Sequence, residues 1–462
     1  MPNSGRPVPL DALHTLTIKE FGRLLRTGQV TSEQVTEACL GRIGAHAVLN
    51  AFILVTADTA RAQAREADRE LATGHDRGPL HGVPISVKDL IDVAGVPTTA
   101  ASRVRDTHVA DHDAPAVAAL RRAGAVFVGK TNLHEFAFGT TNEDSAFGPV
   151  KNPFAPTRSP GGSSGGSAVS VATGMALASI GTDTGGSIRI PSAACGLVGL
   201  KPCAGDVPTA GVVPLSRRLD HVGPLTRTVA DARLVYQGLH AKLSSTPAPV
   251  PVQGLQFAVP RRYFCDILDH DVRARFEEAL ERLRAAGVRI TDVEIPHAHL
   301  IPSVYQHIVL GDAAAYHADT LDHMPERYTP AVRIRLEMGR YLLAEDYVRA
   351  LDARDALRVE VDEALEGEDA LILPSLAIPA PVLGAATVLV ERTQQPVRNL
   401  MLRLTQLFNL TGHAAIALPA GRTGLGLPCS VQLVGPDTPG LLSVAEACEA
   451  HINGTAAHHL RP

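Results

Sequence analysis

The sequence predicts an α/β protein with a largely parallel or mixed sheet that helices cover on both faces. Helical segments alternate along the chain with short apolar strands, and strands near both ends share the same buried character. The chain of 462 residues is 45% hydrophobic and 20% charged, which is typical of a globular protein with a large core. We therefore expect one domain over residues 1–462 rather than two.

Helices dominate the first part of the chain, residues 1–78. Thr31, Ser32 and Glu33 have the pattern of a capped helix start. The stretch 56–73, rich in Ala, Arg and Glu, predicts a second helix that ends near Gly74. Together they form a helical lead-in before the sheet.

The first strand of the sheet is expected at residues 83–88. Its alternation places Val83, Ile85 and Val87 on one face and Ser86 and Lys88 on the other. A lysine in an apolar strand is unusual, and lysine is scarce in this chain. Lys88 is therefore the first candidate for chemistry.

The rest of the chain continues the alternation. The central part, residues 79–240, predicts a helix at 115–123, a buried strand at 125–129, a small apolar helix at 167–178 and a strand at 178–182. Residues 244–251, rich in Ser and Pro, are the best linker candidate. The part 252–462 then supplies strands at 255–259, 288–295, 371–374, 415–419 and 430–434, helices at 271–286 and 441–450, and a mostly helical insertion or lid at 302–366.

Composition excludes several functions. The net charge of −5 provides no basic surface for nucleic acid or an anionic membrane. The N-terminus lacks a signal segment, and no apolar run is long enough to span a bilayer, so we expect a cytoplasmic protein. Six cysteines without a Cys-x-x-Cys pair favour reduced thiols over disulfides or zinc.

The glycine-rich segment 160–167 contains Ser163 and Ser164. A flexible linker is the ordinary interpretation of such a segment, but a buried helix follows it at once, which favours a loop at the helix N-terminus. A phosphate cradle is an alternative, although the Gly-Lys-[Ser/Thr] signature is absent. Gly-x-Ser-x-Gly occurs twice here, but the proline-rich residues 152–160 cannot form the strand that a nucleophile elbow needs.

A second loop contains Thr184, Gly185, Gly186 and Ser187. Two glycines before a serine let successive backbone N–H groups point into one small space, as an oxyanion requires. A plain strand-to-helix turn, with Ser187 as the helix cap, is the alternative.

Lys88 is a candidate base for a serine nucleophile. Most lysines are surface residues, but burial would lower the pKa of this ammonium toward neutrality, and a serine hydroxyl needs a base to react. No Ser-x-x-Lys occurs, and the His134-Glu135 pair lacks the second histidine of a zinc helix. A Ser-His-Asp triad stays open because its members lie far apart in sequence. We expect no metal and no cofactor.

These segments together resemble the amidase signature family. The resemblance covers nearly the whole chain and is strongest from Gly82 to Thr228. Its most specific parts are residues 160–167, 185–192 and 199–202, and it resumes at 409–412 and 430–435. It implies a single α/β domain on a large twisted mixed sheet.

The resemblance also implies roles for individual residues. Ser187 matches the acyl-forming nucleophile, Ser163 the relay serine that follows a cis peptide bond, and Lys88 the base. The oxyanion donors match the backbone N–H groups around Thr184, Gly185, Gly186 and Ser187, and hydrogen-bonding support matches Ser164, Asp183 and Arg189.

Residues 131–141 resemble the segment that shapes the acyl pocket in the A-type component of glutamyl-tRNA amidotransferases. Ile190 stands where that component usually has glutamine, and residues 201–206 depart from its Lys-Pro-Thr-Tyr-Gly-Arg run. These departures favour a free-standing amidase, a monomer or homodimer that uses water to cleave small amides, esters or carbamates (urethanes). A role as the A-type component of an amidotransferase remains the alternative, and a nucleotide-binding protein is a third.

Apolar residues in and beside that segment predict the substrate preference. Candidate substrate-binding residues are Phe136, Phe138, Gly139, Thr140 and Ile190, with Phe147 nearby. An apolar lining favours amides, anilides or carbamates with an apolar or aromatic portion over glutamine or asparagine. The phenylalanines are equally compatible with a plain core role.

Overall fold

The computed structural model describes residues 9–240, 247 and 250–454, and its centre is one eleven-stranded sheet. The strands of this sheet are β1 (Phe52–Val55), β2 (Pro84–Lys88), β3 (Val126–Thr131), β4 (Ala178–Asp183), β5 (Val198–Lys201), β6 (His221–Thr226), β7 (Gln256–Val259), β8 (Arg289–Asp292), β9 (Ala370–Pro374), β12 (Ala414–Arg422) and β13 (Pro428–Gly435). A separate hairpin pairs β10 (Thr387–Val390) with β11 (Thr393–Pro396).

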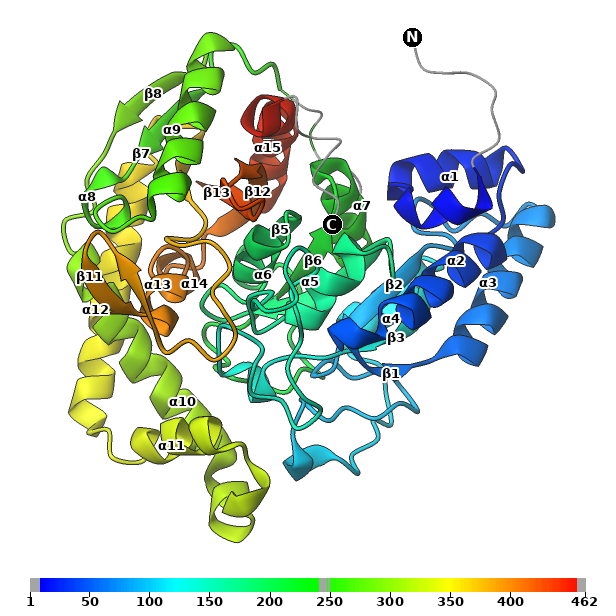
Figure 1. The fold of residues 1–462 in the computed structure, drawn as a ribbon, viewed down its shortest axis with the longest axis horizontal. Coiled ribbons are helices and arrows are strands. Elements are labelled where there is room, and N and C mark those ends of the chain that lie inside the picture. Colours follow the sequence, from blue (N-terminus) through cyan, green and yellow to red (C-terminus); the bar gives the residue numbers. More distant parts are fainter. Residues whose placement is uncertain (1–8, 241–246, 248–249, 455–462) are drawn as a thin grey trace.

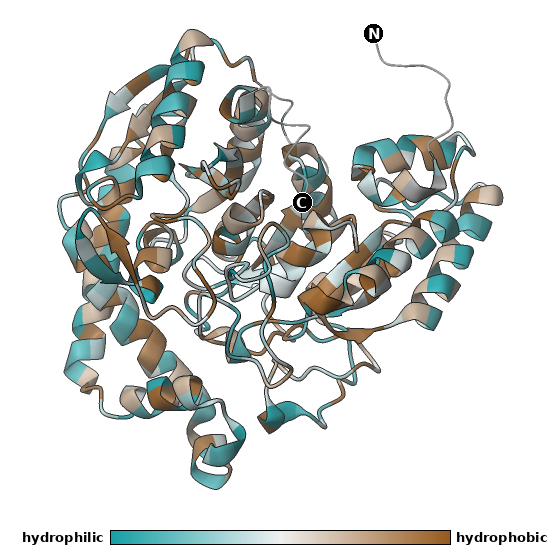
Figure 2. Cartoon of the chain, viewed as in Figure 1, coloured by the Kyte–Doolittle hydropathy of each residue, from teal (hydrophilic) through white to brown (hydrophobic). Residues whose placement is uncertain are grey.

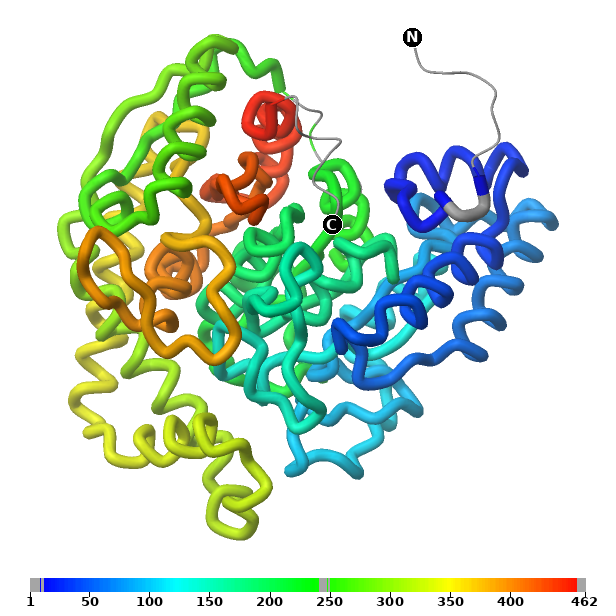
Figure 3. Tube along the Cα trace, viewed as in Figure 1, coloured from blue at the N-terminus to red at the C-terminus, as the bar shows by residue number. Residues whose placement is uncertain are grey.

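The order of the strands confirms the mixed sheet. It runs β1-β3-β2-β4-β6-β5-β12-β13-β9-β7-β8 (Figure 1). Strand β2 is parallel to β3 and β4, and β7 is parallel to β8 and β9. The pairs that join β4, β6, β5, β12, β13 and β9 are antiparallel. Figure 3 shows the orange-red end of the chain returning to the middle of the sheet, where β12 lies between β5 and β13.

Helices flank this sheet on both faces (Figure 1), which confirms the α/β class. Outer helices carry hydrophilic and hydrophobic residues on different faces (Figure 2). The helices are α1 (Ile18–Arg26), α2 (Ser32–Ala45), α3 (Ala57–Ala72), α4 (Pro115–Arg122), α5 (Gly165–Ala172), α6 (Arg189–Ala194), α7 (Val229–Leu239), α8 (Arg261–Phe264), α9 (His270–Ala285), α10 (Ile301–His323), α11 (Pro330–Gly339), α12 (Ala344–Ala364), α13 (Val397–Leu402), α14 (Leu407–Leu410) and α15 (Thr438–Asn453).

Local sequence signals explain several of these elements. The Thr31 hydroxyl accepts a hydrogen bond from the Gln34 N–H, and the Gln34 side chain accepts one from the Thr31 N–H, so a capping box starts α2 as expected. The predicted helix at 167–178 is wrong in its bounds, because α5 begins at Gly165 and ends at Ala172. Gly174, with φ of +74°, turns the chain out of the helix toward β4.

The helical stretch 302–366 is confirmed as α10, α11 and α12, which form a helical insertion at one corner of the molecule (Figure 1). Most of the linker candidate 244–251 lies outside the described residues. No helix within 9–240, 247 and 250–454 combines the length and apolar character that crossing a bilayer requires.

Candidate active site

Lys88 is the last residue of β2, which lies between β3 and β4, and it is completely buried. Its Nζ donates hydrogen bonds to Ser163 Oγ and Thr182 Oγ1, both at 2.8 Å. Burial lowers the pKa of Lys88 to about 7, although the more distant carboxylates of Asp183 and Asp220 oppose this shift. A lysine with such a pKa can hold or release a proton near neutral pH.

Ser163 and Ser164 lie in the loop that leads into α5, and the peptide bond between Gly162 and Ser163 is cis. The Ser164 N–H donates to the Ser187 carbonyl at 3.2 Å, and Ser164 Oγ donates to the Thr182 carbonyl at 3.1 Å. These bonds join the two glycine-rich loops, which are distinct in sequence, into one unit.

Ser187 follows β4 in the turn that precedes α6. It is 6% exposed, whereas Ser163 and Ser164 are fully buried, so a molecule outside the protein reaches Ser187 first. Helix α6 begins at Arg189, and no side chain caps it. The alternative in which Ser187 caps the helix is therefore wrong.

Backbone N–H groups in this turn are only partly free. The Gly186 N–H donates to Asp183 Oδ1 at 2.7 Å, which removes it from the four donors that the resemblance implies. Within the described chain, the N–H groups of Gly185 and Ser187 make no hydrogen bond. Thr405 Oγ1 donates to the Gly185 carbonyl at 2.6 Å and holds the turn from the other side.

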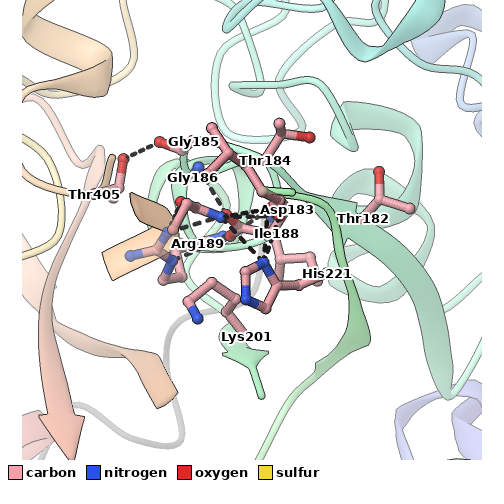
Figure 4. A network of polar contacts seen from close by, with 12 residues as sticks. Thr182, Asp183, Thr184, Gly185, Gly186, Ile188, Arg189, Lys201, His221 and Thr405 are labelled. Carbon is pink, nitrogen blue, oxygen red and sulfur yellow. Dashed lines mark hydrogen bonds and ion pairs between the residues drawn. The ribbon is translucent and has the colours of Figure 1, made fainter. Parts of the chain in front are cut away.

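A buried ion pair supports the turn from beneath (Figure 4). Arg189 donates to both carboxylate oxygens of Asp183, with Nη2–Oδ1 at 3.0 Å and Nε–Oδ2 at 3.1 Å. Burial alone would raise the pKa of Asp183, but the charge and hydrogen bonds of Arg189 outweigh it and lower that pKa. Arg189 also donates to Asn409 and Gln432, so the C-terminal part of the chain helps to fix the site.

Asp220 is a site residue that sequence reasoning missed. Its carboxylate accepts hydrogen bonds from Thr184 Oγ1 at 2.6 Å and from the Leu215 N–H at 3.0 Å. Burial raises the pKa of Asp220 to about 6. Thr182 and Asp220 lie within the segment of strongest family resemblance, and Asn409 lies where it resumes, whereas Thr405 lies outside every segment that shows it.

The predicted pocket segment contacts the helical insertion. Phe136 is 1% exposed, and its ring centroid lies 4.3 Å from that of His317 and 5.5 Å from that of Tyr328. These contacts agree with the core role that the sequence left open for Phe136. Of the other predicted pocket residues, Gly139 lies against the His134 ring and Thr140 lies against Gly162 of the glycine-rich loop. Ile190 packs against Gly186. The Arg103 guanidinium lies over the Phe147 ring.

A cavity of about 410 Å³ lies between α10, α11 and α13. Tyr305 of α10 forms part of its wall, and a Cβ placed on Gly185 would meet the Tyr305 hydroxyl at 2.4 Å. Tyr305 therefore contacts both the cavity and the turn that carries Ser187, whereas no residue of that turn is among the described residues that line the cavity.

Comparison with known proteins assigns this mixed α/β sheet, with its buried lysine and two serine loops, to a family of hydrolases. The family model named Amidase matches residues 34–438. The chain belongs to the amidase family and is an amidohydrolase that acts on C–N bonds.

Several relatives match nearly the full length. The A-type component of glutamyl-tRNA(Gln) amidotransferase from Geobacter metallireducens is 36% identical over 96% of this chain and 98% of its own. An amidase of Pseudomonas putida is 40% identical over 90% of this chain and 92% of its own. A solved crystal structure of an amidase matches with a TM-score of 0.89 and 41% identity, over 94% of this chain and 99% of that one.

Proposed function

We propose that the protein hydrolyses small amides, and carbamates or esters of similar shape, through a relay of Lys88, Ser163 and Ser187. The 2.8 Å hydrogen bond between Lys88 Nζ and Ser163 Oγ carries this proposal, together with the pKa of about 7 for that lysine. Neutral Lys88 accepts the Ser163 proton while Ser163 accepts the Ser187 proton. Ser187 Oγ then forms a bond to the substrate carbonyl carbon.

Charge that develops on the carbonyl oxygen needs hydrogen-bond donors. The N–H groups of Gly185 and Ser187 support this role because they are not used elsewhere in the described chain. As the tetrahedral intermediate collapses, the C–N bond breaks and Ser163 returns a proton to the leaving nitrogen. Water attacks the acyl or carbamoyl enzyme by the same relay, which releases the acid and restores Ser187.

The decisive experiment is to trap the covalent enzyme. We expect intact-protein mass spectrometry after incubation with an aryl carbamate to show one adduct, and peptide mapping to place it on Ser187. Ser187→Ala should form no adduct and should lose activity by about 10⁴-fold or more. An active Ser187→Ala enzyme, or an adduct on another residue, would sink the proposal.

A second candidate is an A-type component in a glutamine-dependent amidotransferase complex, which the 36% identity to such proteins favours. Ile190 and residues 201–206 depart from that pattern and favour the free-standing enzyme. We expect kcat/KM for an aryl amide and an aryl carbamate to exceed that for glutamine. A clear preference for glutamine would support the amidotransferase role instead.

A further inference from the structure

The turn between β4 and α6 contains two consecutive glycines, Gly185 and Gly186, which have no side chains to hold their backbone in place. Contacts from other residues must therefore fix it. Thr405 Oγ1 donates to the Gly185 carbonyl at 2.6 Å, and the Gly186 N–H donates to Asp183 Oδ1 at 2.7 Å. Both contacts hold the peptide between Gly185 and Gly186. The preceding peptide, which carries the Gly185 N–H, depends on Thr184.

Thr184 connects this preceding peptide to a carboxylate. It is 1% exposed, and its Oγ1 donates to Asp220 Oδ1 at 2.6 Å. Figure 4 shows Thr184 and Thr405 on opposite sides of Gly185. Because a β-branched side chain is stiff about its first torsion, a fixed hydroxyl also restricts the backbone to which it is attached. The hydrogen bond from Thr184 to Asp220 therefore restricts the position of the Gly185 N–H.

Asp220 is itself held in place by the segment that precedes β6. Its carboxylate accepts hydrogen bonds from the Leu215 N–H at 3.0 Å and from the Ser216 N–H at 3.2 Å. Ser216 Oγ donates to Asp312 of α10 at 2.6 Å, so the helical insertion supports the same segment. Asp220 is thus a fixed acceptor for the Thr184 hydroxyl.

Resting on the proposed function, we propose that Asp220 is a positioning residue that aims the Gly185 N–H, through Thr184, at the carbonyl oxygen of the substrate. A donor to this oxygen is most effective when it is fixed before the reaction, because the negative charge develops only in the transition state. A mobile N–H would affect the binding of the uncharged substrate much less. Loss of the hydrogen bond between Thr184 and Asp220 should therefore lower kcat far more than it raises KM.

Thr184→Val tests this role, because it removes the hydroxyl and keeps the β-branched shape. We expect kcat for an aryl amide to fall about 10- to 100-fold and KM to change less than about threefold. Thr184→Ser keeps the hydroxyl and should recover most of the loss. Rates are expressed per active enzyme, counted by the completed carbamate adduct on Ser187, so a partial loss of folded protein does not enter. An unchanged kcat in Thr184→Val would overturn the proposal.

Thr226→Val is the matched control. Thr226 is fully buried at the other end of β6, and its Oγ1 donates to the Thr228 carbonyl at 2.9 Å. Removal of this hydroxyl should lower stability, but kcat should stay within about twofold of the wild type. A fall in kcat as large as that of Thr184→Val would show that the loss of any buried hydroxyl slows the enzyme, which would overturn the positioning role.

A double-mutant cycle tests whether Asp220 acts through Thr184. Asp220→Ala should lower kcat at least as much as Thr184→Val, and the double variant should be no slower than Asp220→Ala. Losses that simply add would overturn the proposal. Absence of a Ser187 adduct in the wild type would instead count against the proposed function itself.

The pH profile separates an effect on the turn from an effect on the base. The carboxylates of Asp183 and Asp220 raise the pKa of Lys88 against the larger effect of burial. Asp220→Ala removes one of these charges and should move the rising limb of kcat/KM to lower pH. Thr184→Val leaves both charges in place, so its limb should stay where it is in the wild type. A shifted limb in Thr184→Val would mean that Thr184 acts on the base, contrary to the proposal.

Discussion

Lys88 illustrates how one residue takes its properties from its surroundings. The strand places it between β3 and β4, where burial favours the neutral amine and two hydroxyls fix its Nζ. The alternation of residues 83–88 was enough to predict which face Lys88 occupies. The partner Thr182 lies 94 positions away, and no local pattern reveals such a contact.

The pKa of Lys88 predicts the dependence of activity on pH. If the neutral amine is the base, kcat/KM rises about tenfold per pH unit below 7 and levels off above it, because the pKa is lowered to about 7. Lys88→Arg should be inactive across this range, since a guanidinium stays protonated. The measurement is a pH profile of kcat/KM for one neutral amide.

Lys201 provides the control for this profile. It is also buried, and burial lowers its pKa to about 7, but its Nζ donates to the Pro202 and His413 carbonyls rather than to a serine. We expect the rising limb to persist in whatever activity Lys201→Met retains. Appreciable turnover by Lys88→Arg would mean that the residue supplies positive charge, contrary to the relay.

At the scale of elements, the helical insertion is anchored to the core by buried polar contacts. Glu135 accepts hydrogen bonds from the Thr329 N–H at 2.8 Å and from Thr329 Oγ1 at 2.6 Å, just before α11 begins. Phe136 adds ring contacts with His317 and Tyr328. The segment that the sequence assigned to a pocket wall therefore also positions α10 and α11, which line the cavity.

The hydrogen bonds between Glu135 and Thr329 lead to a prediction about stability. Glu135→Ala removes the acceptor of two hydrogen bonds and should lower the free energy of unfolding by about 2 kcal/mol. Limited proteolysis in the connection around residues 324–329 should accelerate at the same time. Glu135→Gln keeps an acceptor oxygen and should recover much of the loss, and Glu326→Ala, which changes a residue of that connection outside the anchor, should stay within about 0.5 kcal/mol of the wild type. Equal effects of the two alanine variants would show that the anchor contributes nothing specific.

Helices and strands were predicted correctly from the sequence where the signal lies in neighbouring residues. The capping box of α2 and the apolar run of β4 are read from adjacent residues. Strands β1, β5 and β6 were not predicted, and β6 contains Pro224, which cannot donate a sheet hydrogen bond. Neighbouring strands in the sheet, rather than local propensity, hold such segments extended.

For the whole molecule, the continuous sheet bears on the prediction of one domain. Strand β12 pairs with both β5 and β13, so residues from the two parts of the chain share one set of hydrogen bonds. We expect a single calorimetric unfolding transition, with loss of activity and loss of tertiary structure at the same temperature. Two resolved transitions would contradict one domain and favour separately folding parts.

The return of β12 to the centre of the sheet also bears on biosynthesis. Leu200 in β5 pairs with Ile416, so this strand has no partner on that side until nearly nine-tenths of the polypeptide has left the ribosome. The nascent chain therefore carries an unpaired strand edge and exposed apolar surface through nearly half of its translation, from the synthesis of β5 to that of β12. Chaperones that shield emerging hydrophobic segments should raise the yield of active enzyme, and truncated translation products should aggregate rather than accumulate as folded fragments.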